Sequence, residues 1–334
     1  MALMPTRREF LRDAVAGGVA VALAGGGASG EELAQDAFPR RTLGRTGESV
    51  TTVGLGCAYA GSCDEAQTRV TIEAALDSGI RYFDGAPEYT NAEARLGPVL
   101  KPVRDEAFLV TKTYAFDAKQ AEQDLHGSLE RLRTDHVDLF LQHGVGLKPM
   151  WSAHEILGKG GSLEYLRKAK KEGLARYIGM SVHAPHKVAL TLLGESDEWD
   201  VVMPFINCIA RARELDDMTK DNIAEELLPR AQQSDIGIVG MKVLGGHPGE
   251  LANDYDRAFR YALSQPGVAC VLIGVRTVEE VQRAVRAARE FRPLTAGEMQ
   301  ETVRMGEDMY RAKTQAARVL ERHCEGDCWG LERA

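Results

Sequence analysis

Short apolar runs alternate with longer amphipathic segments over most of the 334-residue chain. Apolar runs of this kind predict strands buried on both faces, and apolar residues spaced three and four apart predict helices. Strands are predicted at 53–56, 80–83, 108–112, 137–142, 175–181, 201–207, 237–244 and 268–275. Helices are predicted at 64–78, 91–100, 117–133, 163–171, 186–193, 225–233, 254–264 and 278–289. This alternation favours an α/β fold, a closed parallel (β/α)8 TIM barrel.

Two further segments flank the alternation. Around the turn signal Gly44-Arg45-Thr46-Gly47, two short extended runs predict an N-terminal β-hairpin that caps the barrel floor. Residues 296–323 predict one more helix on the barrel exterior. We therefore expect a barrel over 41–295, and a C-terminal helix with a cysteine-containing tail over 296–334.

An open, doubly wound sheet is the alternative architecture. It requires a Gly-x-Gly-x-x-Gly turn after an early strand, and the segment Gly54-Leu55-Gly56-Cys57 lacks the third glycine. The length of the chain is compatible with a single barrel, because α/β barrels reach this size as one domain. The pattern therefore favours the closed barrel over the open sheet.

Four polar side chains stand at the ends of consecutive predicted strands. Asp84 and Tyr89 follow strand 80–83, Lys112 ends the next strand, and His143 follows the one after that. Taken singly, each side chain has a structural explanation, such as a turn aspartate or a strand-end charge. Together they suit proton transfer to a carbonyl. The phenol of a tyrosine has a pKa of about 10 and is a poor proton donor at neutral pH. A lysine that an aspartate keeps charged would favour the anion of that phenol, and a histidine would orient the carbonyl oxygen.

In this order, Asp84, Tyr89, Lys112 and His143 resemble the catalytic tetrad of the aldo-keto reductases, and the resemblance spans residues 40–290. It implies reduction of a small aldehyde or ketone, or oxidation of the alcohol, by hydride transfer from NADPH with Tyr89 as general acid. A cofactor-binding sensor or regulatory protein of low turnover on the same fold is the alternative. The loops expected to close the pocket, 114–117, 144–161 and 210–222, contain few aromatic residues and indicate no particular substrate.

The resemblance also implies which residues hold the nicotinamide dinucleotide. Ser181 and Asn207 match positions beside the nicotinamide. Gly245 and Gly246 match the loop over the pyrophosphate, where small residues let backbone N–H groups approach phosphate oxygens. Arg276 matches the residue that meets the adenosine 2′-phosphate, so NADPH is favoured over NADH.

Several positions depart from the family pattern. Met203 stands where many members carry a glutamine. Met241, followed by Lys242, stands where many have a tyrosine that stacks on the nicotinamide; a thioether can pack there without stacking. Glu280 and Ala284 replace the glutamine and asparagine that grip the adenine. These departures weaken the expected adenosine end of the cofactor site.

The first thirty residues resemble a twin-arginine (Tat) export signal. Arg7 and Arg8 precede a weakly apolar run over 14–24, followed by a glycine-rich segment in which Ala28 and Gly30 lie near plausible cleavage sites. The run is shorter than the roughly 20 residues that span a bilayer. We expect a signal over 1–30, a linker over 31–40 and export by the Tat machinery, with a periplasmic location. A non-functional signal would leave the protein in the cytoplasm, and an ordinary amphipathic helix is the alternative interpretation.

Composition and the positions of histidines and cysteines argue against other classes of protein. Forty-one Lys and Arg stand against 49 Asp and Glu without a basic patch, which disfavours a nucleic-acid partner. The pair His183 and His186 does not match the ligands of a metal-dependent barrel hydrolase, so no metal is expected. The six cysteines are Cys57, Cys63, Cys208, Cys270, Cys324 and Cys328. Cys324 and Cys328 in the tail are too few for an iron–sulfur cluster. Whether disulfides form between Cys324 and Cys328, or between Cys57 and Cys63, stays an open question. Cys208 and Cys270 suit the core as small apolar residues.

Overall fold

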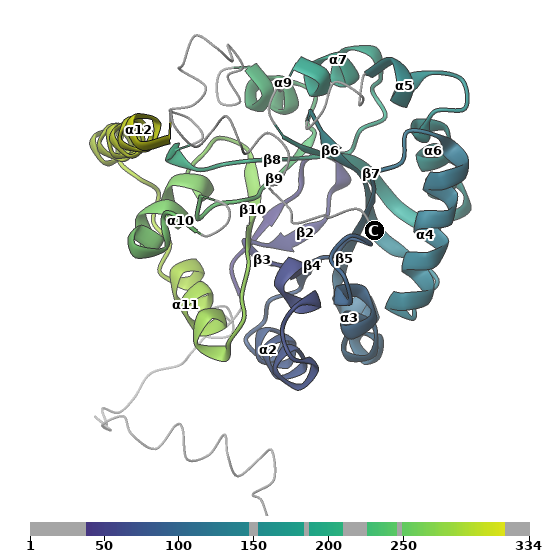
Figure 1. Cartoon of the computed structure of the whole chain (residues 1–334), viewed down its shortest axis with the longest axis horizontal. Helices are drawn as coiled ribbons and strands as arrows, with labels where there is room; N and C mark the ends of the chain where they lie inside the picture. The colour runs from purple at the N-terminus through teal and green to yellow at the C-terminus, as the bar shows by residue number, and fades with distance from the viewer. Residues whose placement is uncertain (1–37, 147–152, 184–186, 210–225, 246–248, 318–334) are drawn as a thin grey trace, which may run out of the picture. The chain divides into compact units, whose positions relative to one another are not determined.

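The computed structural model describes residues 38–146, 153–183, 187–209, 226–245 and 249–317. At its centre is a closed barrel of parallel strands in the order β10-β3-β4-β5-β6-β7-β8-β9 (Figure 1). The barrel strands are β3 (Val53–Gly56), β4 (Tyr82–Asp84), β5 (Phe108–Thr113), β6 (Val137–Val145), β7 (Ala175–Val182), β8 (Val201–Pro204), β9 (Gly237–Gly240) and β10 (Val268–Ile273). The predicted (β/α)8 barrel is confirmed.

Helices surround the strands as an outer layer (Figure 1). The α-helices are α2 (Glu65–Asp77), α3 (Ala92–Leu100), α4 (Ala118–Leu132), α5 (Ala153–Leu157), α6 (Ser162–Glu172), α7 (Lys187–Glu195), α9 (Leu228–Gln233), α10 (Tyr255–Leu263), α11 (Val278–Arg289) and α12 (Ala296–Ala317). Short 3-10 helices are η1 (Gly44–Thr46), η2 (Cys57–Gly61), η3 (Lys101–Glu106) and η5 (Ala252–Asp254). Three of these helices begin with an N-cap side chain that accepts hydrogen bonds from backbone N–H groups of the first turn. The N-cap residues are Asp64 for α2, Asp117 for α4 and Thr277 for α11.

Alternation along the strands sorts side chains between the barrel interior and the helix layer. One apolar cluster fills the interior and includes Tyr82, Phe108, Val110, Leu139 and Leu141. Asp84, Lys112 and His143 continue these inward rows by one step of two residues. The period of the strands therefore places three of the four predicted site residues at the carboxyl rim of the interior.

The N-terminal hairpin lies at the opposite, amino end of the strands. β1 (Arg40–Thr42) pairs antiparallel with β2 (Ser49–Thr51), as predicted. Between them Gly44 has a φ of +47°, and a Cβ there would lie 2.4 Å from the backbone nitrogen of Gly237. Arg45 donates a hydrogen bond to the carbonyl oxygen of Trp199 at 2.5 Å. Since Trp199 and Gly237 stand where β8 and β9 begin, the hairpin closes the floor.

Some predicted boundaries were wrong. The strand predicted at 80–83 begins later, because the N–H of Ile80 still donates to Ala75 at the end of α2. The strand predicted at 237–244 ends at Gly240, and Lys242 adopts a left-handed φ of +52°. The strand predicted at 201–207 ends at Pro204. Within the expected loop 144–161, the short helix α5 was not predicted.

The last described helix, α12, packs its apolar side chains, among them Met299 and Val303, against the core on the barrel exterior. Its predicted end at residue 323 lies outside the described residues, as do the predicted signal 1–30 and the cysteines of the tail. Cys208 and Cys270 are buried, as predicted, while Cys57 and Cys63 are free thiols and form no disulfide. In the described part of the chain, no helix combines the length and the apolar character that crossing a membrane requires.

Candidate active site

Asp84, Lys112 and Tyr89 form one connected group at the rim of the barrel. The Nζ atom of Lys112 donates hydrogen bonds to Asp84 Oδ2 at 2.8 Å, to the carbonyl oxygen of Gly85 at 2.8 Å and to the Tyr89 hydroxyl at 3.3 Å. Lys112 is only 1% exposed. A buried ammonium needs a full set of acceptors, and β4 with the loop after it supplies all three.

His143, on β6, faces the same group from the neighbouring strands. Its ring lies edge-on to Tyr89 with 6.0 Å between ring centroids, and it stacks on Tyr114 at 4.1 Å. Its Nδ1 atom lies 3.2 Å from Oε2 of Glu88. The imidazole is 5% exposed, so its orientation is fixed by two aromatic rings and one carboxyl group.

The electrostatic environment keeps Tyr89 and Lys112 protonated. Burial raises the pKa of Tyr89 to about 12, although the positive charge of Lys112 acts in the opposite direction. Burial on its own lowers the pKa of Lys112, but Asp84 and Tyr89 outweigh it and raise that pKa above its usual value. Lys112 acts in the expected direction, since its charge and its hydrogen bond both lower the pKa of Tyr89, but desolvation is the larger effect and leaves that pKa raised.

His143 is held neutral. Burial lowers the pKa of its imidazole well below the usual value, and the positive charges of Lys112 and Lys242 lower it further. A neutral imidazole has one N–H donor and one acceptor nitrogen. The contact that each ring nitrogen makes therefore decides which of them is available as a donor.

The residues predicted beside the nicotinamide lie on the strands that continue the rim. Ser181, on β7, accepts a hydrogen bond from the N–H of Gly144 at 2.9 Å, directly after His143. Asn207 follows β8, and its side-chain amide donates to the carbonyl oxygen of Lys242 at 2.9 Å. Met241 pairs with Phe205 in a parallel bridge, and the Lys242 ammonium lies 4.1 Å from the Phe205 ring. The amide of Asn207 therefore holds the backbone of Lys242 beside the rim.

The residues predicted to hold the phosphates lie at the edge of the barrel. Gly245 has a φ of +88°, which a side chain would strain, and its N–H donates to Lys242. Gly246 lies outside the described residues. The exposed guanidinium of Arg276 lies 4.2 Å from the centre of the Tyr59 ring. Glu280 accepts the backbone N–H of Arg276 at 2.5 Å, and Ala284 is fully buried in the core.

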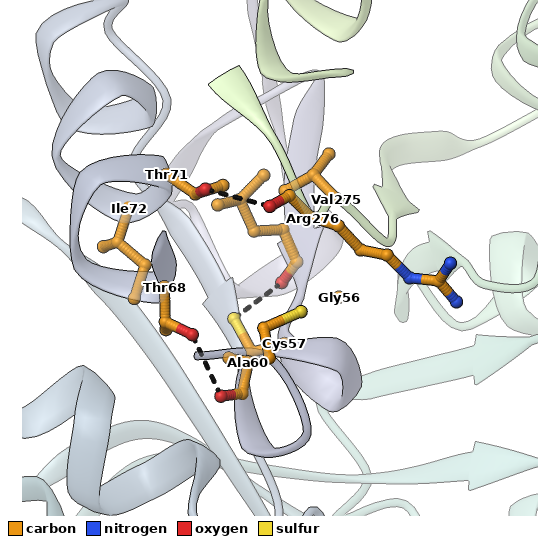
Figure 2. A pocket seen from close by; sticks show the side chains of 10 residues that line it. Gly56, Cys57, Ala60, Thr68, Thr71, Ile72, Val275 and Arg276 are labelled. Carbon is orange, nitrogen blue, oxygen red and sulfur yellow. Dashed lines mark hydrogen bonds between the residues drawn. The ribbon is translucent and has the colours of Figure 1, made fainter. Parts of the chain in front are cut away.

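A small hollow of about 20 Å³ lies beside this edge, lined by residues of η2, α2 and the segment after β10 (Figure 2). Thr71 donates a hydrogen bond to the carbonyl oxygen of Arg276 at 3.2 Å, while the guanidinium of Arg276 points away from the hollow (Figure 2). Such a volume holds about one water molecule. The hollow is too small for a substrate, and it backs the loop that carries Arg276.

The structure thus brings the four tetrad candidates together and places Arg276 apart from them, at the barrel edge. It also adds contacts that the sequence analysis did not predict. Glu88 and Tyr114 contact His143, and Tyr59 contacts Arg276. Glu88 immediately precedes Tyr89, and that adjacency was the one signal in the sequence that pointed to it.

The rim has features that fit a bound nicotinamide dinucleotide. Oδ1 of Asp84 is buried and receives no hydrogen bond from any described residue, so it suits a hydroxyl donor of a ligand. Arg276 offers an exposed guanidinium at the edge, which suits a phosphate. No group of three metal-binding side chains occurs within the described ranges.

Comparisons with known proteins concern the family and the fold. A model of the aldo/keto reductase family matches residues 52–259. L-Galactose dehydrogenase of Arabidopsis thaliana is 26% identical, over 79% of this chain and 91% of the relative. An aldo-keto reductase of Bacillus halodurans, solved in its apo form, is 25% identical with a TM-score of 0.62 and covers 80% of this chain and 96% of its own. An aldo/keto reductase of Klebsiella pneumoniae in complex with NADP and acetate is 21% identical with a TM-score of 0.61, over 81% and 96% of the two chains, and shows the likeness of fold.

Proposed function

This chain belongs to the aldo/keto reductase family of oxidoreductases, and we propose that it reduces an aldehyde or ketone, or oxidises the alcohol, with Tyr89 as proton donor and NADPH as hydride source. One observation supports this most directly: a buried ammonium bridges a carboxylate and a phenol at the rim of the barrel. A surface tyrosine or a strand-end lysine would not need such an arrangement.

The residues of the chain have separate tasks in this reaction. Tyr89 gives its proton to the carbonyl oxygen during reduction and takes a proton from the alcohol in the reverse direction. Lys112 stabilises the phenolate left behind, because its charge lies 3.3 Å from the phenol oxygen. Asp84 compensates the buried lysine charge, and His143 donates a hydrogen bond that orients the carbonyl oxygen.

NADPH would lie across the rim, held by Ser181, Asn207, Met241, Lys242 and Gly245, with Gly246 in the same loop and Arg276 at the adenosine phosphate. When bound, it supplies the hydride that the carbonyl carbon accepts. The preference for NADPH over NADH rests on Arg276, since a guanidinium suits a dianionic phosphate. The Klebsiella pneumoniae structure with bound NADP supports this choice of cofactor for the fold.

The proposal is tested by steady-state assays with NADPH and a broad panel of aldehydes, ketones and reducing sugars. We expect turnover of at least one carbonyl class, and a loss of about 10²- to 10⁴-fold in Tyr89→Phe. Fluorescence titration with NADPH controls for cofactor binding, which the variant should keep. Full turnover in Tyr89→Phe would refute the role of the phenol. A wild type that binds NADPH and turns over no carbonyl would favour the sensor alternative.

We also propose that the protein is exported folded, with its nucleotide bound. The Tat route carries folded proteins, and nicotinamide dinucleotides are made in the cytoplasm, so a closed barrel would cross with the cofactor it already holds. Fractionation of wild type against Arg7→Lys/Arg8→Lys tests the export. Denaturing the periplasmic fraction and measuring the nucleotide that it releases tests whether the exported protein carries its cofactor. Protein found only in the cytoplasm would refute export, and periplasmic protein without nucleotide would refute the link.

A further inference from the structure

Glu88 lies in the rim and has no part in the reaction described so far. It immediately precedes Tyr89 in the loop after β4, and its carboxyl oxygen Oε2 lies 3.2 Å from Nδ1 of His143 on β6. The carboxyl side chain is 25% exposed, against 5% for the imidazole. A single short loop therefore supplies both the proton donor of the reaction and a carboxyl group for the histidine that orients the substrate.

Charged and titratable groups face this pair from several elements. They are Lys112 on β5, Tyr114 after β5, Arg131 on α4, His183 after β7, Lys242 after β9 and Tyr89 beside Glu88. Both lysines, Lys112 and Lys242, disfavour a positive charge on the imidazole of His143. The rings of Tyr89, Tyr114 and His183 pack around the imidazole and limit the access of water to it.

The number of protons on the pair decides what His143 offers the substrate. With two protons, one lies between Glu88 and Nδ1 and the other is on Nε2, which is then a donor. With one proton, the stable arrangement puts it on Nδ1, donated to the Glu88 carboxylate, and Nε2 has none. Moving that proton to Nε2 would leave the Nδ1 lone pair facing a carboxylate, which is repulsive.

We propose that Glu88 is a positioning residue for the reaction: it binds the proton that faces Nδ1 of His143 and so keeps Nε2 a hydrogen-bond donor to the carbonyl oxygen. This inference rests on the proposed reductase function, and it assigns the active form of the enzyme to the two-proton state of the Glu88–His143 pair. Loss of one proton from the pair turns the orienting donor into an acceptor, which repels the lone pairs of the carbonyl oxygen.

The direction of each pKa shift agrees with this assignment. Burial raises the pKa of Glu88, although Lys112 and Arg131 oppose it, and burial lowers the pKa of His143. Both shifts disfavour the ion pair, so the two-proton state is a neutral carboxylic acid donating to a neutral imidazole. Raising the pH removes the proton of Glu88. The rate should therefore be constant below the apparent pKa of the pair, which belongs to both groups together, and fall about tenfold per pH unit above it.

Glu88→Gln separates this role from a structural one. The glutamine amide has the same shape, donates to Nδ1 at every pH and keeps the proton on Nε2. We expect kcat/KM close to wild type on the low-pH plateau and no fall at higher pH, so that one unit above the wild-type pKa the variant exceeds wild type about tenfold. Glu88→Leu, which cannot donate to Nδ1, is the matched control and should have a lower kcat over the whole pH range.

A readout without turnover keeps the inference separate from the proposed function. Nitrogen-15 NMR of the full chain bound to NADP+ reports which imidazole nitrogen carries the proton, and the spectrum of His143→Gln identifies the His143 signals. In wild type the proton should move from Nε2 to Nδ1 as the pH rises, whereas in Glu88→Gln it should stay on Nε2. A tautomer of His143 that does not respond to pH in wild type, or pH profiles of wild type and Glu88→Gln that superimpose, would overturn the role of Glu88.

Discussion

The reaction end of the proposed site, formed by Asp84, Tyr89, Lys112 and His143, differs in construction from the proposed adenosine end, formed by Tyr59, Arg276 and Glu280. The reaction end stands on or just after strands, and its charges are buried and joined by hydrogen bonds of 2.8 to 3.3 Å. The adenosine end stands on η2 and the segment from β10 into α11, where the Arg276 guanidinium is exposed and rests on the face of one aromatic ring.

This difference in burial sets how strongly each end should respond to substitution. A buried ammonium tolerates little change, because removing either partner leaves an uncompensated charge in the interior. An exposed guanidinium is solvated in any case, so its neighbours can change at little cost. Substitutions at the two ends should therefore differ in both size and kind.

The largest effect is expected for Lys112→Met. Turnover should fall about 10²- to 10³-fold, since the charge that stabilises the phenolate is lost. The free energy of unfolding should also fall by about 3–5 kcal/mol, since the buried carboxyl group of Asp84 loses its charged partner. The double variant Asp84→Asn/Lys112→Met should regain part of that stability but none of the turnover, as measured by denaturant titration and steady-state assay. Unchanged turnover in the single variant would contradict this account of the reaction end.

A smaller, cofactor-specific effect is expected for Arg276→Met. Loss of the contact between guanidinium and phosphate should raise KM for NADPH about tenfold, with little change in kcat or in the KM for NADH. Arg276→Lys is the control, which keeps the charge and should lose less. An equal change in KM for both cofactors would show that Arg276 does not distinguish them, and stability should be unaffected because the side chain is exposed.

The smallest effect is expected for Tyr59→Leu. The variant loses the aromatic ring on which the Arg276 guanidinium rests, and a cation–π contact at an exposed site contributes about 0.5–1 kcal/mol. The KM for NADPH should therefore rise about two- to fivefold. Tyr59→Phe keeps the ring and should behave as wild type. If Tyr59→Leu and Arg276→Met were additive in the double variant, the two side chains would act independently, and the proposed positioning by Tyr59 would fail.

Much of the reaction end could be predicted from the sequence. The apolar runs predicted the strands in chain order, and Asp84, Lys112 and His143 were predicted to meet because they stand at the carboxyl ends of consecutive strands. Less of the adenosine end could be predicted, because Arg276 was assigned by resemblance and its aromatic partner lies in a different loop. The sequence also could not predict that burial outweighs Lys112 and raises the pKa of Tyr89, since this depends on how completely the ring is desolvated.

The sequence by itself determined the barrel, its hairpin floor and the meeting of the strand ends, because hydrophobic periodicity is a local property that each segment carries. Only the tertiary structure decided that Glu88 faces His143, 55 positions further along the chain, and that Tyr59 underlies Arg276. Such contacts depend on strand register and on the path of each loop. Polar loop residues have no periodic pattern that encodes either, so their partners are fixed only when the barrel closes.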